Sequence, residues 1–528
     1  MKVDNQEQDR IDPPTQLPTV APPSRTVGSN VTVERLILVM AIAMGAFLRL
    51  WDINGLGYNS DEAVYAGQGA AIAQAPVYKD IFPVFRAHPL LFQFILALVF
   101  QSEVVDVNGR LVSVAIGLAT VYLVYLLGKL LYGPRAGAVA ALLMALMPYH
   151  VVVTRQVLLD GPMVFCTTLT LYLLAQFAMT EKPVWLHTAG IGMGLSFLAK
   201  ETAIILVGAV YAFLALSREI RVRLLDLALS LVFMAIMIAP VPLSLMLAGG
   251  TTTGRNYLVW QLFRRPNHTW DFYPTTVPAA IGLLVVALAL LGLWVLRHER
   301  SWRERLLIWW ILVPVAFFQL WPTKGFQYLL PIAPAVALLA ARTLTHWQIH
   351  RNLPFVNPAY TPRIKTASTA IVGLSIGLAS WQAIQPPTTG TFIAGSGGVP
   401  GGREAGVWVS ENIPEGATLL TVGPSMANIL QFYGHRKAYG LSVSPNPLRR
   451  NPSYQPVINP DLQIRNSEIQ YLVWDSYSAE RSSFFSDGLL RLARRFHGRV
   501  IHTESVLVTL EDGTQVAKPV IVIYEVRP

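Results

Sequence analysis

Long apolar runs separated by short polar segments dominate the pattern of this chain. A helix that crosses a bilayer needs about 17–25 mostly apolar residues, and eleven runs approach or reach that length. They lie at residues 34–51, 108–131, 136–152, 161–179, 185–199, 202–217, 223–247, 276–296, 304–320, 326–343 and 366–385. The pattern predicts a polytopic α-helical membrane protein with about eleven transmembrane helices.

One further apolar run, at residues 88–101, decides the orientation of every later segment. If this run spans the membrane, the basic loops that follow face outside; if it lies flat at the interface, they face the cytoplasm, as the positive-inside rule requires. Those loops contain Lys129, Arg135, Lys182, Arg218, Arg221, Arg223, Arg297, Arg300, Arg303, Arg305, Arg342, Arg351, Arg363 and Lys365. We therefore predict a juxtamembrane helix within a first outer loop of about residues 52–107, and a cytoplasmic N-terminus.

The two ends of the chain differ from this apolar part. Residues 1–32, with the stretch IDPPTQLPTVAPPS, carry too little apolar surface to fold and predict a disordered cytoplasmic tail. Residues 387–528 alternate strand-like runs such as ATLLTVG with a helical stretch, GLLRLARRF, and turn signals. They predict a soluble extracytoplasmic α/β domain that follows a transmembrane domain at 33–386.

Composition supports the membrane assignment and narrows the partners. The chain is 53% hydrophobic and only 14% charged, with a mean hydropathy of +0.44. Its net charge is +10, and the basic residues lie between apolar runs. They form no basic patch interleaved with aromatic residues, which argues against nucleic acid as a partner. The one cysteine, Cys166, excludes an intramolecular disulfide and a cysteine-based metal site.

Acidic residues lie where predicted helices meet the outer face. Asp61 and Glu62 follow the first apolar run in the stretch GLGYNSDEAVYAGQG, and Asp160 opens the fourth. Ionisable groups at span ends are functional candidates, because burying a charge in a membrane is costly. A carboxylate here could act as a general base towards a hydroxyl. Ser60, Asp61 or Asp160 could instead cap a helix, and Arg155 could pair with Asp160 to order a loop.

Cationic and aromatic residues recur at the same face. Lys200 interrupts the stretch GLSFLAKETAIILV, and Lys324 and Tyr328 lie in WPTKGFQYLLP. Each lysine could meet the phosphate of a lipid, although a turn explains Lys200 and snorkelling to the interface explains Lys324 equally well.

Four further basic residues occupy the predicted outer loops. Arg86 and His88 precede the juxtamembrane helix, where a phosphate contact and an ordinary polar interface role are both open. Arg255 and His268 lie in the loop at 248–275, where they could contact acceptor or lipid. His88 and His268 could together bind a metal, but their spacing over separate loops is not a metal motif.

An ordered series of segments resembles a known family. The first span ends in LRLW and is followed by the Asp61-Glu62 pair, HPLL at 88–91, NGRLVSVAIGLATVYLVYLLGKLLYG at 108–133, AGAVAALLMALMP from 136, RQVLLD before the fourth span, FLAKET, and KGFQYLLP at 324–331. Over residues 34–345 this set resembles the polytopic GT-C-type glycosyltransferases that use lipid-phosphate sugars. That superfamily includes the protein O-mannosyltransferases, the lipid A aminoarabinose transferase and related bacterial proteins.

The resemblance implies roles for individual residues. Asp61 inherits the role of catalytic base with Glu62 beside it, and Asp160 supports the acceptor or the first-loop carboxylate. Cationic residues near the outer face hold the lipid phosphate in this family, which implies Arg86, Lys200 and Lys324. The tail is not a sugar-binding repeat domain, and the first loop has no second carboxylate in a D-x-D metal motif. No obligatory metal or other cofactor is therefore expected.

The sequence as a whole predicts an integral inner-membrane glycosyltransferase that inverts the anomeric carbon. Its donor would be a sugar on a polyprenyl phosphate, and its acceptor an unidentified hydroxyl or amine on a protein, lipid or glycan. A lipid or solute transporter would instead carry charges at mid-bilayer and internal pseudo-symmetry. An outer-face glycan ligase or polymerase of another fold remains a second alternative. The sequence does not reveal the sugar, the oligomeric state or the role of the tail.

Overall fold

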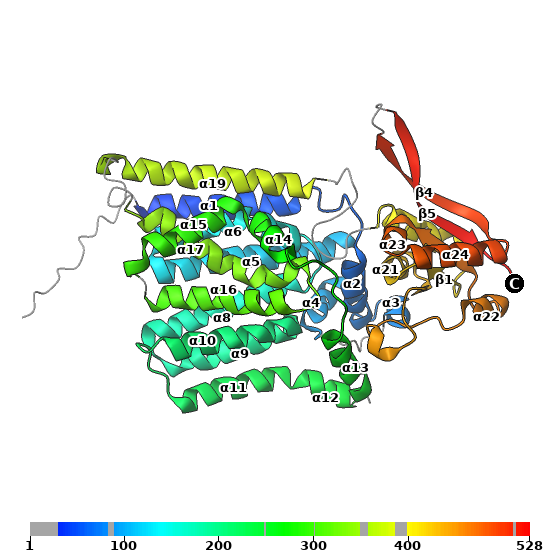
Figure 1. Cartoon of the computed structure of the whole chain (residues 1–528), viewed down its shortest axis with the longest axis horizontal. Coiled ribbons are helices and arrows are strands. Elements are labelled where there is room, and N and C mark those ends of the chain that lie inside the picture. The colour runs from blue at the N-terminus through cyan, green and yellow to red at the C-terminus, as the bar shows by residue number, and fades with distance from the viewer. Residues whose placement is uncertain are drawn as a thin grey trace, which may run out of the picture.

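A bundle of long helices and a smaller strand-containing domain at one of its ends make up the protein (Figure 1). This computed structural model describes residues 30–82, 89–247, 250–299, 301–348, 357–385, 399–509 and 514–528. Helix α1 begins at Asn30, slightly earlier than the predicted boundary of the tail. The remainder of that predicted tail, residues 1–29, lies outside the described residues.

Every apolar run of the predicted spanning set is helical in the structure. These helices are α1 (Asn30–Leu50), α5 (Asp106–Tyr132), α6 (Pro134–Leu146), α7 (Pro148–Thr154), α8 (Asp160–Thr180), α9 (Pro183–Ala199), η1 (Glu201–Ile204), α10 (Ile205–Leu216), α11 (Leu224–Ile238), α12 (Pro240–Leu247), α14 (Phe272–Ile281), α15 (Leu283–Val295), α16 (Trp302–Leu320), η3 (Phe326–Ile332), α17 (Ala333–His346) and α19 (Thr361–Ile384). By length and hydropathy alone, five helical segments of the described residues could cross a membrane, or seven if two bent pairs each count as one span.

In each of the two bent pairs, one continuous apolar run forms two helices with a bend between them. Helices α6 and α7 meet at 60° and helices α14 and α15 at 95°. The second bend follows Pro278 and turns at Gly282, whose φ of +103° favours glycine. The run at 276–296 is therefore not the single straight helix that its hydropathy predicts.

The outside of the bundle is apolar, as a lipid-facing surface must be. Leu225 on α11, Leu374 on α19 and Val39 on α1 are each more than 60% exposed. Apolar surface spread over several long helices far exceeds the isolated patches of soluble proteins. Inside the bundle, Gly128 and Gly137 bring α5 and α6 into backbone contact, because a Cβ on either glycine would lie within 2.7 Å of the other helix.

The segment between α1 and α5 folds into three short helices, α2 (Ser60–Ile72), α3 (Tyr78–Ile81) and α4 (Leu91–Phe100). Helix α4 corresponds to the predicted juxtamembrane helix. Its ten residues extend about 15 Å, half the thickness of a bilayer core. Phe92 and Leu96 pack inward against α2, whereas Phe94 and Leu98 on the opposite face are more than half exposed.

The C-terminal domain, residues 399–528, contains one five-stranded sheet. Its strands are β1 (Thr418–Thr421), β2 (Lys437–Gly440), β3 (Tyr471–Asp475), β4 (Arg499–Thr509) and β5 (Gln515–Glu525), in the order β2-β1-β3-β5-β4. The first three are parallel, and β5 is antiparallel to both β3 and β4. Helices α20 (Gly402–Asn412), α21 (Pro424–Gly434), α22 (Pro460–Arg465), α23 (Ser476–Arg481) and α24 (Ser483–Arg495) connect and cover them.

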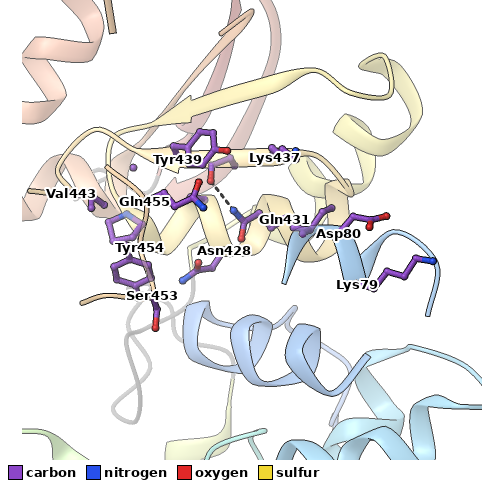
Figure 2. A pocket seen from close by; sticks show the side chains of 15 residues that line it. Lys79, Asp80, Asn428, Gln431, Lys437, Tyr439, Val443, Ser453, Tyr454 and Gln455 are labelled. Carbon is purple, nitrogen blue, oxygen red and sulfur yellow. Dashed lines mark hydrogen bonds between the residues drawn. The ribbon is translucent and has the colours of Figure 1, made fainter. Parts of the chain in front are cut away.

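Helix α21 joins this domain to the segment between α1 and α5. The amide of Asn428 donates to the hydroxyl of Ser60 at 2.9 Å, and the hydroxyl of Tyr433 donates to the carboxylate of Asp106 at 2.5 Å. The same hydroxyl accepts from the backbone N–H of Tyr58 at 2.6 Å. Beside this junction is a pocket of about 310 Å³ between α3 and the C-terminal domain, with Asn428 in its wall (Figure 2).

Candidate functional site

The first turn of α2 carries the Asp61-Glu62 pair. Asn59 caps this helix, because its side-chain oxygen accepts from the backbone N–H groups of Asp61 at 2.9 Å and Glu62 at 3.0 Å. The capping function that the sequence allowed for Ser60 or Asp61 therefore belongs to Asn59. Asp61 is half-buried in the first turn, where the helix dipole favours a negative charge.

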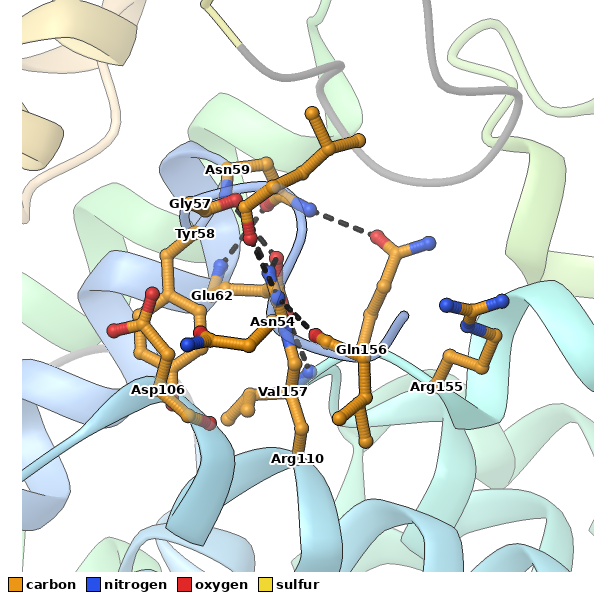
Figure 3. Close-up of polar contacts among 12 residues, drawn as sticks. Asn54, Gly57, Tyr58, Asn59, Glu62, Asp106, Arg110, Arg155, Gln156 and Val157 are labelled. Carbon is orange, nitrogen blue, oxygen red and sulfur yellow. Dashed lines mark hydrogen bonds and ion pairs between the residues drawn. The ribbon is translucent and has the colours of Figure 1, made fainter. Parts of the chain in front are cut away.

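The carboxylate of Glu62 is bound by the guanidinium of Arg110 and by two backbone N–H groups (Figure 3). Its carboxylate forms a two-pronged ion pair with Arg110 of α5, each N–O distance being 3.0 Å. The backbone N–H groups of Asn59 and Val157 donate to the same two oxygens at 3.1 and 3.0 Å. Arg110 also donates to the carbonyls of residues 53, 56 and 57. Glu62 thus fixes the loop that presents Asp61.

Asp160 forms a buried ion pair with Lys200. The ammonium lies 2.8 and 2.9 Å from the two carboxylate oxygens, and both side chains are more than 90% buried. Burial disfavours the charged lysine, yet the neighbouring Asp160 and Tyr328 keep the pKa of Lys200 above its usual value. Lys200 also lies 5.0 Å from the centre of the Tyr328 ring. Three of the predicted residues are therefore in one cluster.

Tyr65 of α2 lies near two carboxylates of the predicted site, Asp61 and Asp160, and near Glu201. Burial raises the pKa of the Tyr65 hydroxyl, and the negative charges of Asp61, Asp160 and Glu201 raise it further. Glu201 follows Lys200 directly and accepts from the hydroxyl of Tyr257 at 2.6 Å. The first outer loop, the start of α8 and the break between α9 and α10 thus meet at one end of the bundle.

A second basic group borders this cluster. Lys324 is buried just before η3, and its ammonium lies 5.8 Å from the centre of the Trp270 ring. Asn267 clamps its backbone with two hydrogen bonds of 2.8 Å. Partial burial lowers the pKa of the neighbouring His268, as do the charges of Arg481 and Lys324. His268 is exposed and stacks on Phe272.

The remaining predicted residues have other surroundings or lie outside the described part of the chain. Arg155 donates to the carbonyls of Trp51 at 2.6 Å and Leu48 at 3.3 Å, so it ties down the end of α1. Asp160 pairs with Lys200 instead of Arg155. Arg255 is exposed on α13 (Thr251–Leu262). Arg86 and His88 fall in residues 83–88, outside the described residues. Within the described ranges, no group of three His, Cys, Asp or Glu side chains could hold a metal.

Sequence reasoning missed four residues that shape this cluster. Arg110 stood inside a predicted span and was not singled out, although an arginine near a span end is a candidate for pairing. Glu201 follows Lys200 directly in the stretch FLAKET and carries no signal of its own beyond that position. Tyr65 and Tyr257 carried no usable signal, because tyrosine is common at membrane interfaces.

A second cavity lies on the Glu62 side of the first outer loop. It has a volume of about 410 Å³ between that loop and the C-terminal domain. Arg110, Arg155 and Arg403 border it, together with Glu62 and Glu504. Both domains therefore line the space beside Glu62 and Arg110.

Comparison of the sequence with known families gives one match. The model of a family described as dolichyl-phosphate-mannose-protein mannosyltransferase matches residues 87–244, from the end of the first outer loop into α12. No curated protein matches the chain.

Comparison with solved structures identifies the fold. ArnT from Cupriavidus metallidurans in its apo state superposes with a TM-score of 0.65 at 14% identity, over 93% of this chain and 97% of that one. The same protein bound to undecaprenyl phosphate gives 0.66 at 14% identity, over 94% and 98%. An oligosaccharyltransferase from Archaeoglobus fulgidus gives 0.54 at 15% identity, over 91% of this chain and 72% of that one. The chain has the GT-C fold, and with the family match this indicates a glycosyltransferase.

Proposed function

We propose that this glycosyltransferase moves a sugar from a polyprenyl-phosphate donor to an acceptor hydroxyl or amine at the extracytoplasmic face of the membrane. The observation that carries the proposal is the convergence of Asp61, Asp160 and Lys200 at one end of the bundle. These polar groups come from three separate segments: the first turn of α2, the start of α8 and the break after α9. The family match covers two of those segments.

The donor is proposed from the cationic groups and from a similar structure. ArnT, which shares this fold, has been crystallised with undecaprenyl phosphate. In this chain Lys200 and Lys324 are buried cations at the end of the bundle, and Tyr328 lies beside Lys200. A lipid phosphate bound between the two lysines would accept charge-assisted hydrogen bonds from both. Lys200 would then give up part of its contact with Asp160. Arg86 and His88 remain proposed donor contacts.

Asp61 is the proposed general base. As the acceptor oxygen bonds to the anomeric carbon, its proton passes to the Asp61 carboxylate. The bond from the anomeric carbon to the phosphate oxygen breaks, and its electron pair stays on the departing polyprenyl phosphate. Attack from the side opposite the phosphate inverts the anomeric carbon. Base assistance of this kind contributes about 100- to 10,000-fold in rate.

The remaining groups support these two roles. Negative charge grows on the leaving phosphate as the bond breaks, and Lys200 and Lys324 would stabilise it electrostatically. Asp160 orients Lys200 through its two short contacts. Glu62 acts through Arg110 and the loop backbone, which makes it a positioning residue. Arg155 secures the neighbouring end of α1, and Arg255 and His268 are proposed contacts for acceptor or lipid.

The proposed membrane arrangement has eleven spans and an extracytoplasmic C-terminal domain. The ten-residue α4 supports this count, because it is too short to span and exposes Phe94 and Leu98 on its outer face. The end of the bundle opposite the site carries basic residues, for example Arg342, which pairs with Glu304 at 3.2 Å, and Lys365. A cytoplasmic location of that end agrees with the positive-inside rule.

Transfer by the purified protein tests the proposal. Polyprenyl phosphates carrying defined sugars, beginning with mannose, are supplied with membrane extracts as the source of acceptor, and released polyprenyl phosphate is measured. Wild type should consume a donor, and Asp61→Asn should lose at least about 100-fold in rate. Asp80→Asn removes an exposed carboxylate of the same loop and should change little. Undiminished turnover by Asp61→Asn would refute the base assignment.

A further inference from the structure

In the parallel part of the C-terminal sheet, the connections that follow β1 and β3 lead in different directions. From β1 the chain passes through α21 to β2 on one side, whereas β3 lies on the other side of β1 and continues into α23. In open α/β sheets, ligands bind outside the carboxyl ends of two such neighbouring strands. Here those ends are occupied by Gly423, before α21, and by α23 itself. A Cβ on Gly423 would lie 3.1 Å from the hydroxyl oxygen of Ser478, so the two connections are in contact.

Helix α23 and its N-cap residue, Asp475, contain two buried polar atoms that the described residues leave without a hydrogen-bond partner. One carboxylate oxygen of Asp475 accepts from the backbone N–H of Ser478 at 2.7 Å and so caps the helix, while the other has no partner. The hydroxyl of Tyr477 also lacks one, although that residue is only 8% exposed. Buried polar groups are usually satisfied, so an orphaned tyrosine hydroxyl indicates a place for a ligand or water.

This helix lies beside the catalytic candidates. Asn428 of α21 hydrogen-bonds to Ser60, the residue directly before Asp61, and α21 begins at the Gly423–Ser478 contact. Burial raises the pKa of the Tyr477 hydroxyl to about 12; the charge of Arg481 opposes the rise, and the charges of Asp61 and Asp475 add to it. The carboxylate of the proposed base therefore acts on Tyr477 together with that of Asp475, the last residue of β3.

Arg481 completes the arrangement. Its guanidinium lies 4.2 Å from the centre of the Tyr477 ring. It is exposed, and none of the ion pairs within the described residues involves it. Its charge acts together with that of Lys324 on His268, which links α23 to the loop on the other side of the site. An exposed guanidinium supported on an aromatic ring keeps its five donors available for a ligand.

We propose that α23 is the acceptor-binding element of the site, in which the Tyr477 hydroxyl and the Arg481 guanidinium hold the acceptor while Asp61 faces its reacting group. This inference rests on the proposed transfer reaction. Arginine only donates hydrogen bonds, and tyrosine donates or accepts. The part of the acceptor next to the reacting group should therefore carry hydrogen-bond-accepting oxygens. Asp475 is a positioning residue, because it acts by capping α23.

The test separates transfer to an acceptor from loss of the sugar to water. Full-length protein in native membranes receives polyprenyl-phosphate mannose with a radiolabelled sugar, and label in membrane acceptors and free sugar are counted separately. Arg481→Ala should reduce transfer about tenfold to a hundredfold, since a hydrogen bond to a charged group contributes about 1.5–3 kcal/mol. Release of free sugar should change less than about twofold, because water needs no acceptor subsite. Tyr477→Phe should reduce transfer by a smaller factor in the same direction.

Two control variants make the same kinds of substitution at other positions of the C-terminal domain. Arg465→Ala removes another exposed arginine of the domain, and Tyr471→Phe removes a hydroxyl from the adjoining strand. Both should leave transfer and release unchanged. Unchanged transfer in Arg481→Ala and Tyr477→Phe would overturn the role of α23, and so would an equal fall in transfer and release. If wild type neither transfers nor releases sugar while retaining its fold, the proposed function fails first and this inference with it.

Discussion

The Lys200 ammonium contacts both oxygens of the Asp160 carboxylate, at 2.8 and 2.9 Å, from a position forty residues later in the chain. Lys200 lies at the break between α9 and η1, where its extended backbone turns the side chain away from the helical path. Because both partners are buried, the pair couples the start of α8 to the end of α9. That coupling ties the stability of the bundle to the proposed phosphate site.

Breaking this pair on one side should destabilise the protein strongly. Lys200→Met leaves a buried carboxylate without its counter-charge, which typically costs about 3–5 kcal/mol. The double variant Asp160→Asn, Lys200→Met should recover a large part of that loss, because it buries no unpaired charge. Thermal unfolding in detergent measures both. As a control, Arg499→Ala breaks an exposed pair with Glu525 and should cost under about 1 kcal/mol. Equal losses in single and double variants would contradict the expected coupling.

Asp61 and Glu62 should respond differently to loss of charge although they are adjacent. Glu62→Gln removes the negative charge that pairs with Arg110 and replaces one of the two oxygens by an NH2 group, which leaves one of the two backbone N–H groups without its acceptor. Stability should therefore fall by about 2–4 kcal/mol along with activity. Asp61→Asn should abolish transfer with little change in the unfolding temperature. Parallel measurements of turnover and thermal unfolding distinguish the two. A stable but inactive Glu62→Gln protein would instead assign chemistry to Glu62.

The hydroxyl of Tyr433 should be a main link between the two domains. It donates to Asp106 and accepts from the backbone N–H of Tyr58, so Tyr433→Phe removes a hydrogen bond from each group. Among the described residues, the Asp106 carboxylate then keeps only its longer ion pair with Arg403, at 3.7 Å. We expect about 1–3 kcal/mol of local destabilisation. Hydrogen exchange followed by mass spectrometry should show faster exchange at residues 57–60 and in α21. Helix α17, far from this contact, serves as the internal reference and should exchange as in wild type.

Asp475 should make the C-terminal domain lose stability as the pH rises. Burial raises its pKa to about 6, above the unfolded value of 3.8, so the folded state prefers the protonated form. This contribution is complete below about pH 4 and is lost as the pH rises through about 6. Asp475→Asn keeps the cap on α23 and should exceed wild type in stability by on the order of 2 kcal/mol at neutral pH, but not in acid. Melting curves over this pH range provide the check; a constant difference would contradict the assignment.

The orientation in the membrane can be tested by cysteine labelling, because the one native cysteine, Cys166, is buried. Ser102 and Thr180 are both exposed and lie at opposite ends of the bundle. Ser102→Cys should react with a membrane-impermeant maleimide in intact cells. Thr180→Cys should react only after the membrane is opened. The reverse pattern would overturn the proposed extracytoplasmic site.

Much of this architecture follows from the sequence, because the signals for a membrane helix are local. Each apolar run near the required length is helical, and the run at 88–101, for which the charge pattern predicts a juxtamembrane helix, contains the ten-residue helix α4. The ordered segments around Asp61, Lys200 and Lys324 resemble the GT-C superfamily in the sequence alone. Hydropathy could not reveal the 95° break at Gly282, since a bend changes backbone direction and not apolar content.

The tertiary structure decided which polar groups meet. Nothing local distinguishes Glu62, whose oxygens are committed to Arg110 and the backbone, from Asp61 beside it. By sequence Lys200 could have marked no more than a turn; its contact with Asp160 depends on how α8 and α9 pack. The position of Tyr477 beside the site depends on how a separate domain docks through Asn428 and Tyr433. Spacing along a chain fixes which face of one helix a residue occupies, whereas pairing across helices depends on packing that only the whole fold specifies.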